Sequence, residues 1–221
     1  MDVIDALNSR HSVRSYTGDP VDKGTLLKIV AAATRAPSWG DTQPWEIFVA
    51  GGDPLDRLRK GFLARFDHDA PAQIDYERPK SWPPALQQRM VENTGNRYAV
   101  QGIARDDEAG RKADRRRQFE FFGAPAVVFL CMDRGLTAWS VFDVGMLAQS
   151  IMLAAQEFGL DSIPAINLVS YPDLIRAEVS IPDSVMILLG IALGHADTGA
   201  SVNKARSIRR PIEEVVCFVG L

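Results

Sequence analysis

The chain has 221 residues, of which 46% are hydrophobic and 24% charged, so it is long enough to bury the core of one globular domain. Its formal net charge of −3 argues against a dedicated nucleic-acid-binding protein, because such proteins usually carry a basic domain. No N-terminal signal pattern and no uninterrupted apolar run of the roughly 18 residues that a spanning helix needs is present. We therefore predict one domain over residues 1–221 in a soluble, cytoplasmic protein without a nucleic-acid or membrane partner.

The cysteines and histidines do not form a recognisable metal-binding or disulfide pattern. Cys131 and Cys217 lie far apart within apolar runs, so we expect two small buried side chains. Neither CxxC nor HExxH occurs, and the three histidines show no ligand spacing. No metal site is predicted.

The N-terminal segment is a short amphipathic helix followed by the basic stretch Arg10-His11-Ser12-Val13-Arg14. In an extended segment alternate side chains share one face, so Arg10, Ser12 and Arg14 are expected to point the same way. Two guanidinium groups and a hydroxyl then form an anion receptor. This pattern alone is more typical of a solvated basic loop, and we expect His11 to bond backbone rather than to act as an acid or base.

A helix, a loop and a strand come next. Residues 22–35 carry regularly spaced apolar side chains after a capping Asp22 and stop before Pro37, which predicts a helix. The loop of residues 37–44, rich in Pro, Gly and polar residues, leads into a strand over residues 45–50. Asp-Pro at 53–54 opens a further helix to about residue 66.

The middle of the chain begins with an aperiodic stretch over residues 68–84, which indicates a surface excursion. Two helices are predicted after it, over residues 84–101 and 106–122, and we expect Arg115 and Arg116 to lie on a solvated helix face. The continuous apolar run at residues 124–132 predicts a strand that is buried on both faces.

The last third contains the strongest helix prediction, residues 138–158, where apolar side chains surround nearly the whole circumference and indicate a central buried helix. Its Asp143 is expected to be a partnered buried carboxylate rather than a catalytic one. Residues 161–169 contain the stretch Ile163-Pro164-Ala165-Ile166-Asn167, which we interpret as turn-like, and Pro172 starts a short helix. Strands are predicted at residues 184–193 and, in the tail, at Val215–Val219.

Common nucleotide and nucleophile motifs are absent, namely GxGxxG, GxxxxGK[ST] and GxSxG. What stands out is a basic cluster at each end of the chain, the second formed by Lys204, Arg206, Arg209 and Arg210. A tightly bound anionic cofactor would explain both clusters without any catalytic side chain.

Taken in order and spacing, several motifs resemble the nitroreductase family of FMN enzymes, a group that includes iodotyrosine deiodinases and flavin-destroying relatives. The resemblance runs from Asp2 to Gly220. It rests on RHSVR at 10–14, APSWGDTQPW at 36–45, FFGAP at 121–125, GIALG at 190–194 and RSIRRPIEEV at 206–215. It implies an α+β fold, with a mixed or antiparallel sheet flanked by helices, in an intertwined homodimer that holds two FMN molecules at its interface.

The resemblance also implies roles for the two basic clusters. Arg10 and Ser12, with His11 between them, would hold FMN near its phosphate, and Arg14 would lie near the pyrimidine edge of the flavin. Arg206 and Arg209 match the phosphate-binding tail of the family.

Further contacts to the cofactor would come from the middle of the chain. The second subunit would supply Pro37, Ser38 and Trp39. The segment Ile163-Pro164-Ala165 matches the place where a backbone N–H approaches flavin N5, and since proline has no N–H, the donor should be Ala165 or a near neighbour.

Two residues depart from the common family pattern. Gln118 stands where many relatives have Asn, which can alter a flavin contact. Asp41 stands where relatives often have Asn and puts a carboxylate near the site, where it could repel acidic substrates. Trp39 and Asp41 are the predicted substrate contacts, although Trp39 could equally serve only to pack the interface.

By this resemblance the protein is an NAD(P)H-dependent reductase with a ping-pong mechanism, in which nicotinamide and then a nitroaromatic or quinone occupy the same place. FMN would carry the chemistry, tuned by Arg14 and the backbone of Ala165, with no catalytic side chain. Reductive dehalogenation or alkene reduction on the same fold, and a non-catalytic flavin carrier or sensor, are the alternatives. NADH and NADPH are both left open as co-substrate.

Overall fold

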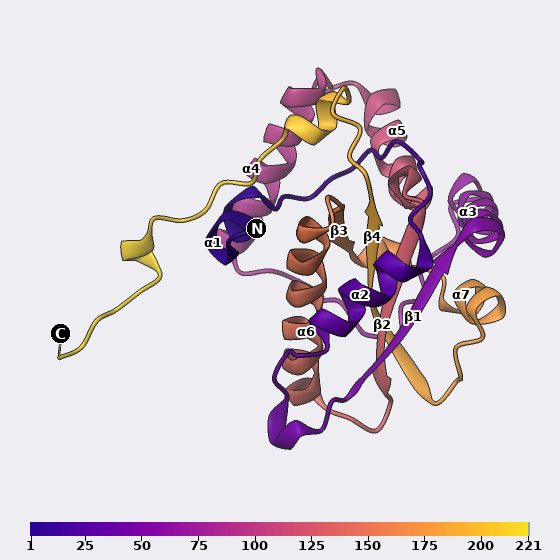
Figure 1. Cartoon of the computed structure of the whole chain (residues 1–221). Helices are drawn as coiled ribbons and strands as arrows, with labels where there is room; N and C mark the ends of the chain where they lie inside the picture. Colours follow the sequence, from indigo (N-terminus) through magenta and orange to yellow (C-terminus); the bar gives the residue numbers. More distant parts are fainter. Residues whose placement is uncertain (221) are drawn as a thin grey trace.

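The computed structural model describes residues 1–220 and is built on a four-stranded antiparallel sheet in the order β1-β2-β4-β3 (Figure 1). The strands are β1 Trp45–Gly51, β2 Ala126–Asp133, β3 Asp161–Ala165 and β4 Val185–Gly194. Seven of the eight residues in β2 are buried, as its continuous apolar run predicted. The α+β expectation is confirmed, and within the described residues the sheet is antiparallel rather than mixed.

Seven α-helices surround the sheet within the described residues. They are α1 Val3–Ser9, α2 Lys23–Ala33, α3 Gly52–Asp67, α4 Pro84–Gln101, α5 Glu108–Phe119, α6 Ala138–Glu157 and α7 Pro172–Val179. Helices α2 and α6 cover one face of the sheet, and α3 and α7 cover the other, so a separate apolar cluster fills the space on each side (Figure 1). Helices α4 and α5 pack together beyond one end of the sheet.

The stretch interpreted as turn-like, residues 163–167, is a strand for its first three residues. β3 pairs with β4 from Asp161↔Gly194 to Ala165↔Gly190, and a 3₁₀ turn at Ile166–Val169 follows. A proline is tolerated at this position because β3 is an edge strand, so the missing N–H of Pro164 removes no hydrogen bond of the sheet. The prediction of a turn was therefore wrong for residues 163–165, whereas Ile166 and Asn167 do lie in a turn.

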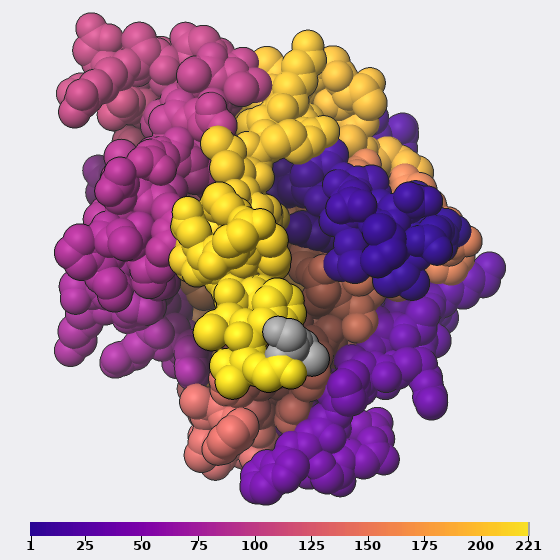
Figure 2. All heavy atoms as spheres, turned by 90° about the vertical axis from the view of Figure 1, so that its left-hand side faces the viewer, coloured from indigo at the N-terminus to yellow at the C-terminus, as the bar shows by residue number. Residues whose placement is uncertain are grey.

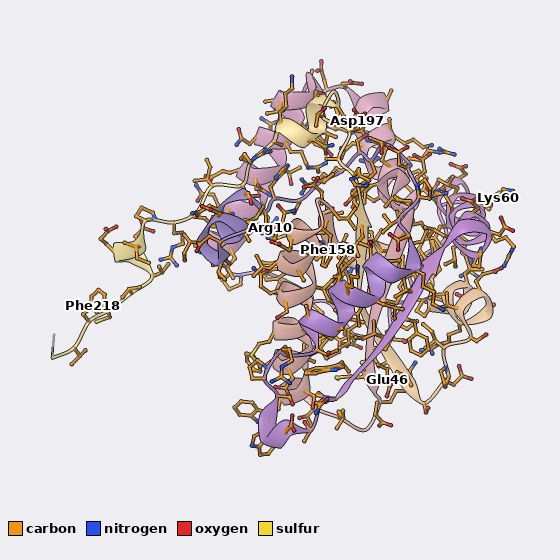
Figure 3. All side chains as sticks on the ribbon, in the orientation of Figure 1. Arg10, Glu46, Lys60, Phe158, Asp197 and Phe218 are labelled. Carbon is orange, nitrogen blue, oxygen red and sulfur yellow. The ribbon has the colours of Figure 1, made fainter. Side chains whose placement is uncertain are left out.

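The strand predicted at Val215–Val219 was also wrong for the single subunit. After a 3₁₀ turn at Ile212–Glu214, the tail runs away from the body, and Phe218 is 73% exposed (Figures 1 and 3). A strand needs a neighbouring strand to complete its backbone hydrogen bonds, and within residues 1–220 no strand pairs with this run. Cys217 is consequently exposed, whereas Cys131 is fully buried as expected.

Helix α6 is a core helix on one side only. Leu147 and Ile151 are fully buried against the sheet, but Trp139 and Phe142 on the other side are each 68% exposed. It is the helix among the described residues that is long and apolar enough to cross a membrane by length and composition. Its buried face is the one that packs on β2 and β3, so the prediction of burial all round holds for half of its circumference.

Candidate functional site

The basic stretch after α1 lies along the outer edge of β3. The N–H of Val13 donates to the carbonyl of Ser162 at 3.2 Å, and Ser12 forms a parallel bridge with the same residue. Val13 is fully buried, so its neighbours on either side, Ser12 and Arg14, turn to the opposite face. The extended conformation predicted from the alternation is therefore present.

A buried asparagine from the far end of the chain fixes this stretch. Asn203 Oδ1 accepts the N–H of Arg14 at 2.7 Å, while its Nδ2 donates to the carbonyls of Ser15 at 2.7 Å and Asp197 at 2.9 Å. The sequence analysis missed Asn203, since its partners are up to 189 positions away and only the fold brings them together.

The two arginines of the stretch occupy different environments. Burial first, and then Arg97 on α4, lowers the pKa of Arg14 to about 10. Arg14 Nη1 donates to the carbonyl of Ser12 at 3.0 Å. For Arg10, burial and the nearby Arg209 lower the pKa, which means that guanidinium groups from both ends of the chain lie close together. Like charges brought together in this way favour an anion between them.

His11 contacts backbone. Its Nδ1 lies 3.1 Å from the carbonyl oxygen of Ser9. This is the backbone-bonded arrangement expected for a histidine without an acid–base role.

The C-terminal basic segment is held loosely. Arg206 Nη1 donates to the carbonyl of Asn203 at 2.7 Å, whereas Arg209 Nη1 donates to the carbonyl of Ser207, two residues away on the same exposed segment. Between this segment and α4 lies a groove of about 790 Å³ lined by apolar, amide and charged side chains of both signs, including Arg89, Glu92 and Arg209. Figure 2 shows the segment as a yellow strip that crosses the surface between α4 and α1.

The loop predicted to contact cofactor and substrate is remote from these arginines within one subunit. The N–H of Trp39 donates to Asp143 near the start of α6, at 3.3 Å, whereas Ser9, next to Arg10, bonds Gln156 at the other end of that helix. A helix rises about 1.5 Å per residue, so these two points on α6 are about 20 Å apart. Figure 3 shows Arg10 close to the α6 end that Phe158 marks.

The side chains of the loop are oriented outward. Trp39 is 75% exposed, and its ring lies 6.4 Å from that of Trp139. Asp41 adopts a positive φ of 56° and accepts a hydrogen bond from Gln43 Nε2 at 3.0 Å. Pro37 and Ser38 lie on the same loop, so one subunit does not bring these four residues to Arg10 and Arg14. Asp143 is buried and partnered, as predicted.

Gln118, at the end of α5, lies beside the segment that follows β3. Its Oε1 accepts a hydrogen bond from Asn167 Nδ2 at 2.6 Å, and Asn167 Oδ1 accepts one from Arg78 Nη2 at 3.0 Å. The excursion of residues 68–84 is thereby anchored next to the predicted flavin segment. Neither Asn167 nor Arg78 was found from the sequence, because neither belongs to a local motif.

The hydrogen-bond alternation of β3 bears on the predicted backbone donor. The Ser162 carbonyl points outward to Val13, so Ser162 and Pro164 face the outer edge, and Ile163 and Ala165 face β4. The N–H of Ala165 is thus directed at Gly190. The next residue with an N–H free to point outward is Ile166, a near neighbour of the kind that the sequence analysis allowed.

These residues fit an anionic cofactor with a planar ring. Permanently charged guanidinium groups suit a phosphate. Arg14 still has donors left after its one bond to the Ser12 carbonyl. The hydroxyl of Ser162 is buried beneath the same stretch and has no hydrogen-bond partner within the described residues. An unpaired buried hydroxyl is what a site for another polar group would leave.

The fold and the paired basic clusters define the class of protein first: an α+β domain that presents an anion site at a sheet edge. The model of the "Nitroreductase family" matches residues 7–195, and the chain belongs to that family. The family expected from the sequence motifs is thereby confirmed.

Individual relatives match over nearly their whole length. The "4-nitrobenzoate reductase" of Pseudomonas putida is 31% identical over 96% of this chain and 93% of its own. The structure of the FMN and NADPH-dependent nitroreductase NfnB from Sphigopyxis sp. strain HMH has 35% identity, full coverage of both chains and a TM-score of 0.94. NfnB from Mycobacterium smegmatis, solved in complex with NADPH, has 30% identity, a TM-score of 0.92 and coverage of 98% and 97%.

Proposed function

We propose that this protein is an FMN-dependent NAD(P)H nitroreductase that reduces nitroaromatic compounds. The observation that carries the proposal is that Ser12 and Val13 pair with Ser162 on the edge of β3, with Arg10 and Arg14 on either side of them and Arg209 near Arg10. Relatives of the chain supply the substrate class, since they include the 4-nitrobenzoate reductase named above and a nitrobenzene nitroreductase of Ectopseudomonas oleovorans.

FMN supplies the redox chemistry when bound, taking a hydride from NAD(P)H and delivering electrons to the acceptor. The chain contributes binding and orientation. Arg10 and Arg209 would hold the phosphate, and Arg14, half-buried and fixed through its backbone, would place a cation at the pyrimidine edge. A cation there stabilises the reduced cofactor preferentially, because the reduced ring carries the negative charge.

The proposed mechanism is ping-pong, in which nicotinamide and acceptor occupy one binding site in turn. Quinones are proposed as a second class of acceptor. Trp39 is proposed to line that binding site, and Asp41 is proposed to repel acidic acceptors. Because a 4-nitrobenzoate reductase is a relative, comparing 4-nitrobenzoate with nitrobenzene tests the filter directly. Asp41→Asn should improve the ratio of kcat/KM for the acid over that for the neutral compound.

We propose that the enzyme is an intertwined homodimer in the cytoplasm. Three apolar surfaces of the single subunit lack cover: the outer side of α6 with Trp139 and Phe142, Trp39 on its loop, and the tail with Phe218. Exposed apolar patches of this kind mark interfaces. A second subunit would cover them and would bring its loop to the first subunit's arginines, which the 20 Å spacing along α6 forbids within one chain.

One preparation tests these points together. The purified protein should be yellow and dimeric by light scattering, and rapid mixing with NADH or NADPH should bleach the flavin absorbance. A panel of nitro, quinone, halogenated and enone compounds should then restore it, fastest with a nitroaromatic. A protein that binds FMN without oxidising NAD(P)H would be the flavin carrier, and a monodisperse monomer with stoichiometric FMN would contradict the dimer.

A further inference from the structure

Helices α4 and α5 are joined through one buried carboxylate, Asp114, whose side chain is only 2% exposed. It forms an ion pair with Arg97 of α4, accepts a hydrogen bond from Gln101 Nε2 at 3.1 Å, and lies 3.2 Å from Arg117 Nη2. Burial alone would raise the pKa of this carboxyl, but these partners lower it overall. Asp114 is therefore charged and satisfied.

This junction lies beside Arg14. Helix α4 packs on the 3₁₀ turn Ser201–Lys204, and Asn203 in that turn holds the N–H of Arg14. After burial, Arg97 is the next cause that lowers the pKa of Arg14, and Asp114 opposes it. Arg97 and Arg117 thus contact one carboxylate in a partly buried region next to the turn that holds Arg14, and the charge of this group is positive.

We propose that Asp114 is a positioning residue of the reductase that, by holding Arg97 in place and offsetting its charge, sets the reduction potential of the FMN bound next to Arg14. The inference rests on the proposed function. Asp114 touches neither cofactor nor substrate in this scheme and acts through Arg97. The reduction potential should respond because reduction adds negative charge to the flavin ring. Nearby positive charges stabilise this added charge, and nearby negative charges destabilise it.

The sign of the effect separates this role from a purely structural one. Replacing Asp114 with Asn leaves more positive charge beside the flavin and should favour the reduced form. Replacing Arg97 with Gln removes positive charge and should favour the oxidised form. A helix–helix ion pair without electrical influence on the cofactor would show loss of stability in both variants and no opposite movement of the potential.

Spectroelectrochemical titration of the holoenzyme, with melting of the apoprotein as a second readout, tests the proposal. Asp114→Asn should strengthen binding of reduced relative to oxidised FMN about tenfold, which raises a two-electron potential by about 30 mV. Arg97→Gln should lower the potential by a similar amount, and the double variant should return close to wild type. Arg97→Lys, which keeps the charge, should stay near the wild-type potential.

Asp173→Asn is the matched control. It breaks the ion pair that Asp173 makes with Arg65 between α7 and α3, and it should lower the melting temperature without moving the potential. If Asp114→Asn does not fold, the Arg97→Gln and Arg97→Lys pair still decides, because only the first should shift the potential. Shifts of the same sign at Asp114 and Arg97, or none, would overturn the inference.

The wild-type protein separates this inference from the proposed function. Failure to bind FMN, or to pass electrons from NAD(P)H to a nitroaromatic, would contradict the function before any variant is made. Normal wild-type turnover with unmoved potentials in the variants would leave the function intact and remove only the role of Asp114.

Discussion

The two basic segments of the site are held in opposite ways. Residues 10–14 are bound along β3, with Val13 fully buried and the N–H of Arg14 fixed by Asn203. Residues 206–210 lie exposed on the surface, and Arg209 bonds only a carbonyl two residues away. One half of the proposed anion site is therefore part of the core, and the other half lies exposed on the surface.

Because of this difference, substitutions in the two segments should affect stability and cofactor binding differently. Changes in the first segment should cost stability as well as cofactor, because its hydrogen bonds belong to the fold. Substitutions in the second segment should weaken cofactor binding without lowering stability. The following variants, in order of expected effect, test or refine this distinction between stability and cofactor binding.

Asn203→Ala should have the largest effect. It strands the N–H of Arg14 and the carbonyls of Ser15 and Asp197 in a buried place, which should lower the free energy of unfolding by about 3 kcal/mol. Urea unfolding of the apoprotein measures this loss. The exposed Asn96→Ala is the control and should change stability by less than about 0.5 kcal/mol. Equal stability of the two variants would mean that the first segment is not held by the core.

Arg10→Ala and Arg209→Ala should each weaken FMN binding by on the order of 2 kcal/mol, since each leaves part of a phosphate dianion unpaired. Fluorescence titration of apoprotein with FMN measures this directly. Arg209→Ala should leave the unfolding free energy of the apoprotein unchanged. Retention of flavin through dialysis by both variants, to the wild-type level, would show that the phosphate lies elsewhere.

Gln118→Asn should have a smaller effect. The shorter side chain draws the amide oxygen back from Asn167, to which it is now bonded at 2.6 Å, while keeping the same donor and acceptor groups. FMN should be retained and the steady-state rate should change only modestly, as measured with one nitroaromatic. Complete loss of FMN would mean that this position has a different role from the one assigned to it.

The pH dependence of stability should show the smallest effect. The pKa of Asp114 is lowered in the folded protein from its ordinary value of 3.8, so its stabilising contribution is present above that value and is lost as the pH falls through the lower folded pKa. The stability difference between wild type and Asp114→Asn should therefore stay nearly constant at higher pH and shrink as the pH falls below 3.8 in urea unfolding. A constant difference would mean that the carboxylate does not titrate with folding.

Local patterns in the sequence predicted most helices and strands, because capping and side-chain alternation depend on residues that are close together in the sequence. Asp22 caps α2 through Thr25, as its position before the apolar run indicated, and the alternation in residues 10–14 correctly indicated an extended segment. The family motifs led to the right fold because they combine many weak local signals.

What the sequence did not reveal depends on distant partners. Val215–Val219 has the composition of a strand but no neighbouring strand in its own subunit, and pairing cannot be inferred from one segment. Asn203 and Asp114 are ordinary polar residues whose importance arises from three partners each. The strand β3 was hidden by Pro164, which usually marks a turn.

Pro164 also protects the molecule in solution. The outer edge of β3 is covered by residues 12–13 along its first part, and beyond them the proline offers no donor to an incoming strand. Open sheet edges are the places where folded chains join into aggregates, and proline is one of the residues that blunts them. Replacing it would restore a donor at the rim of the sheet and expose a template for unwanted assembly during synthesis, before a partner or cofactor has covered this face.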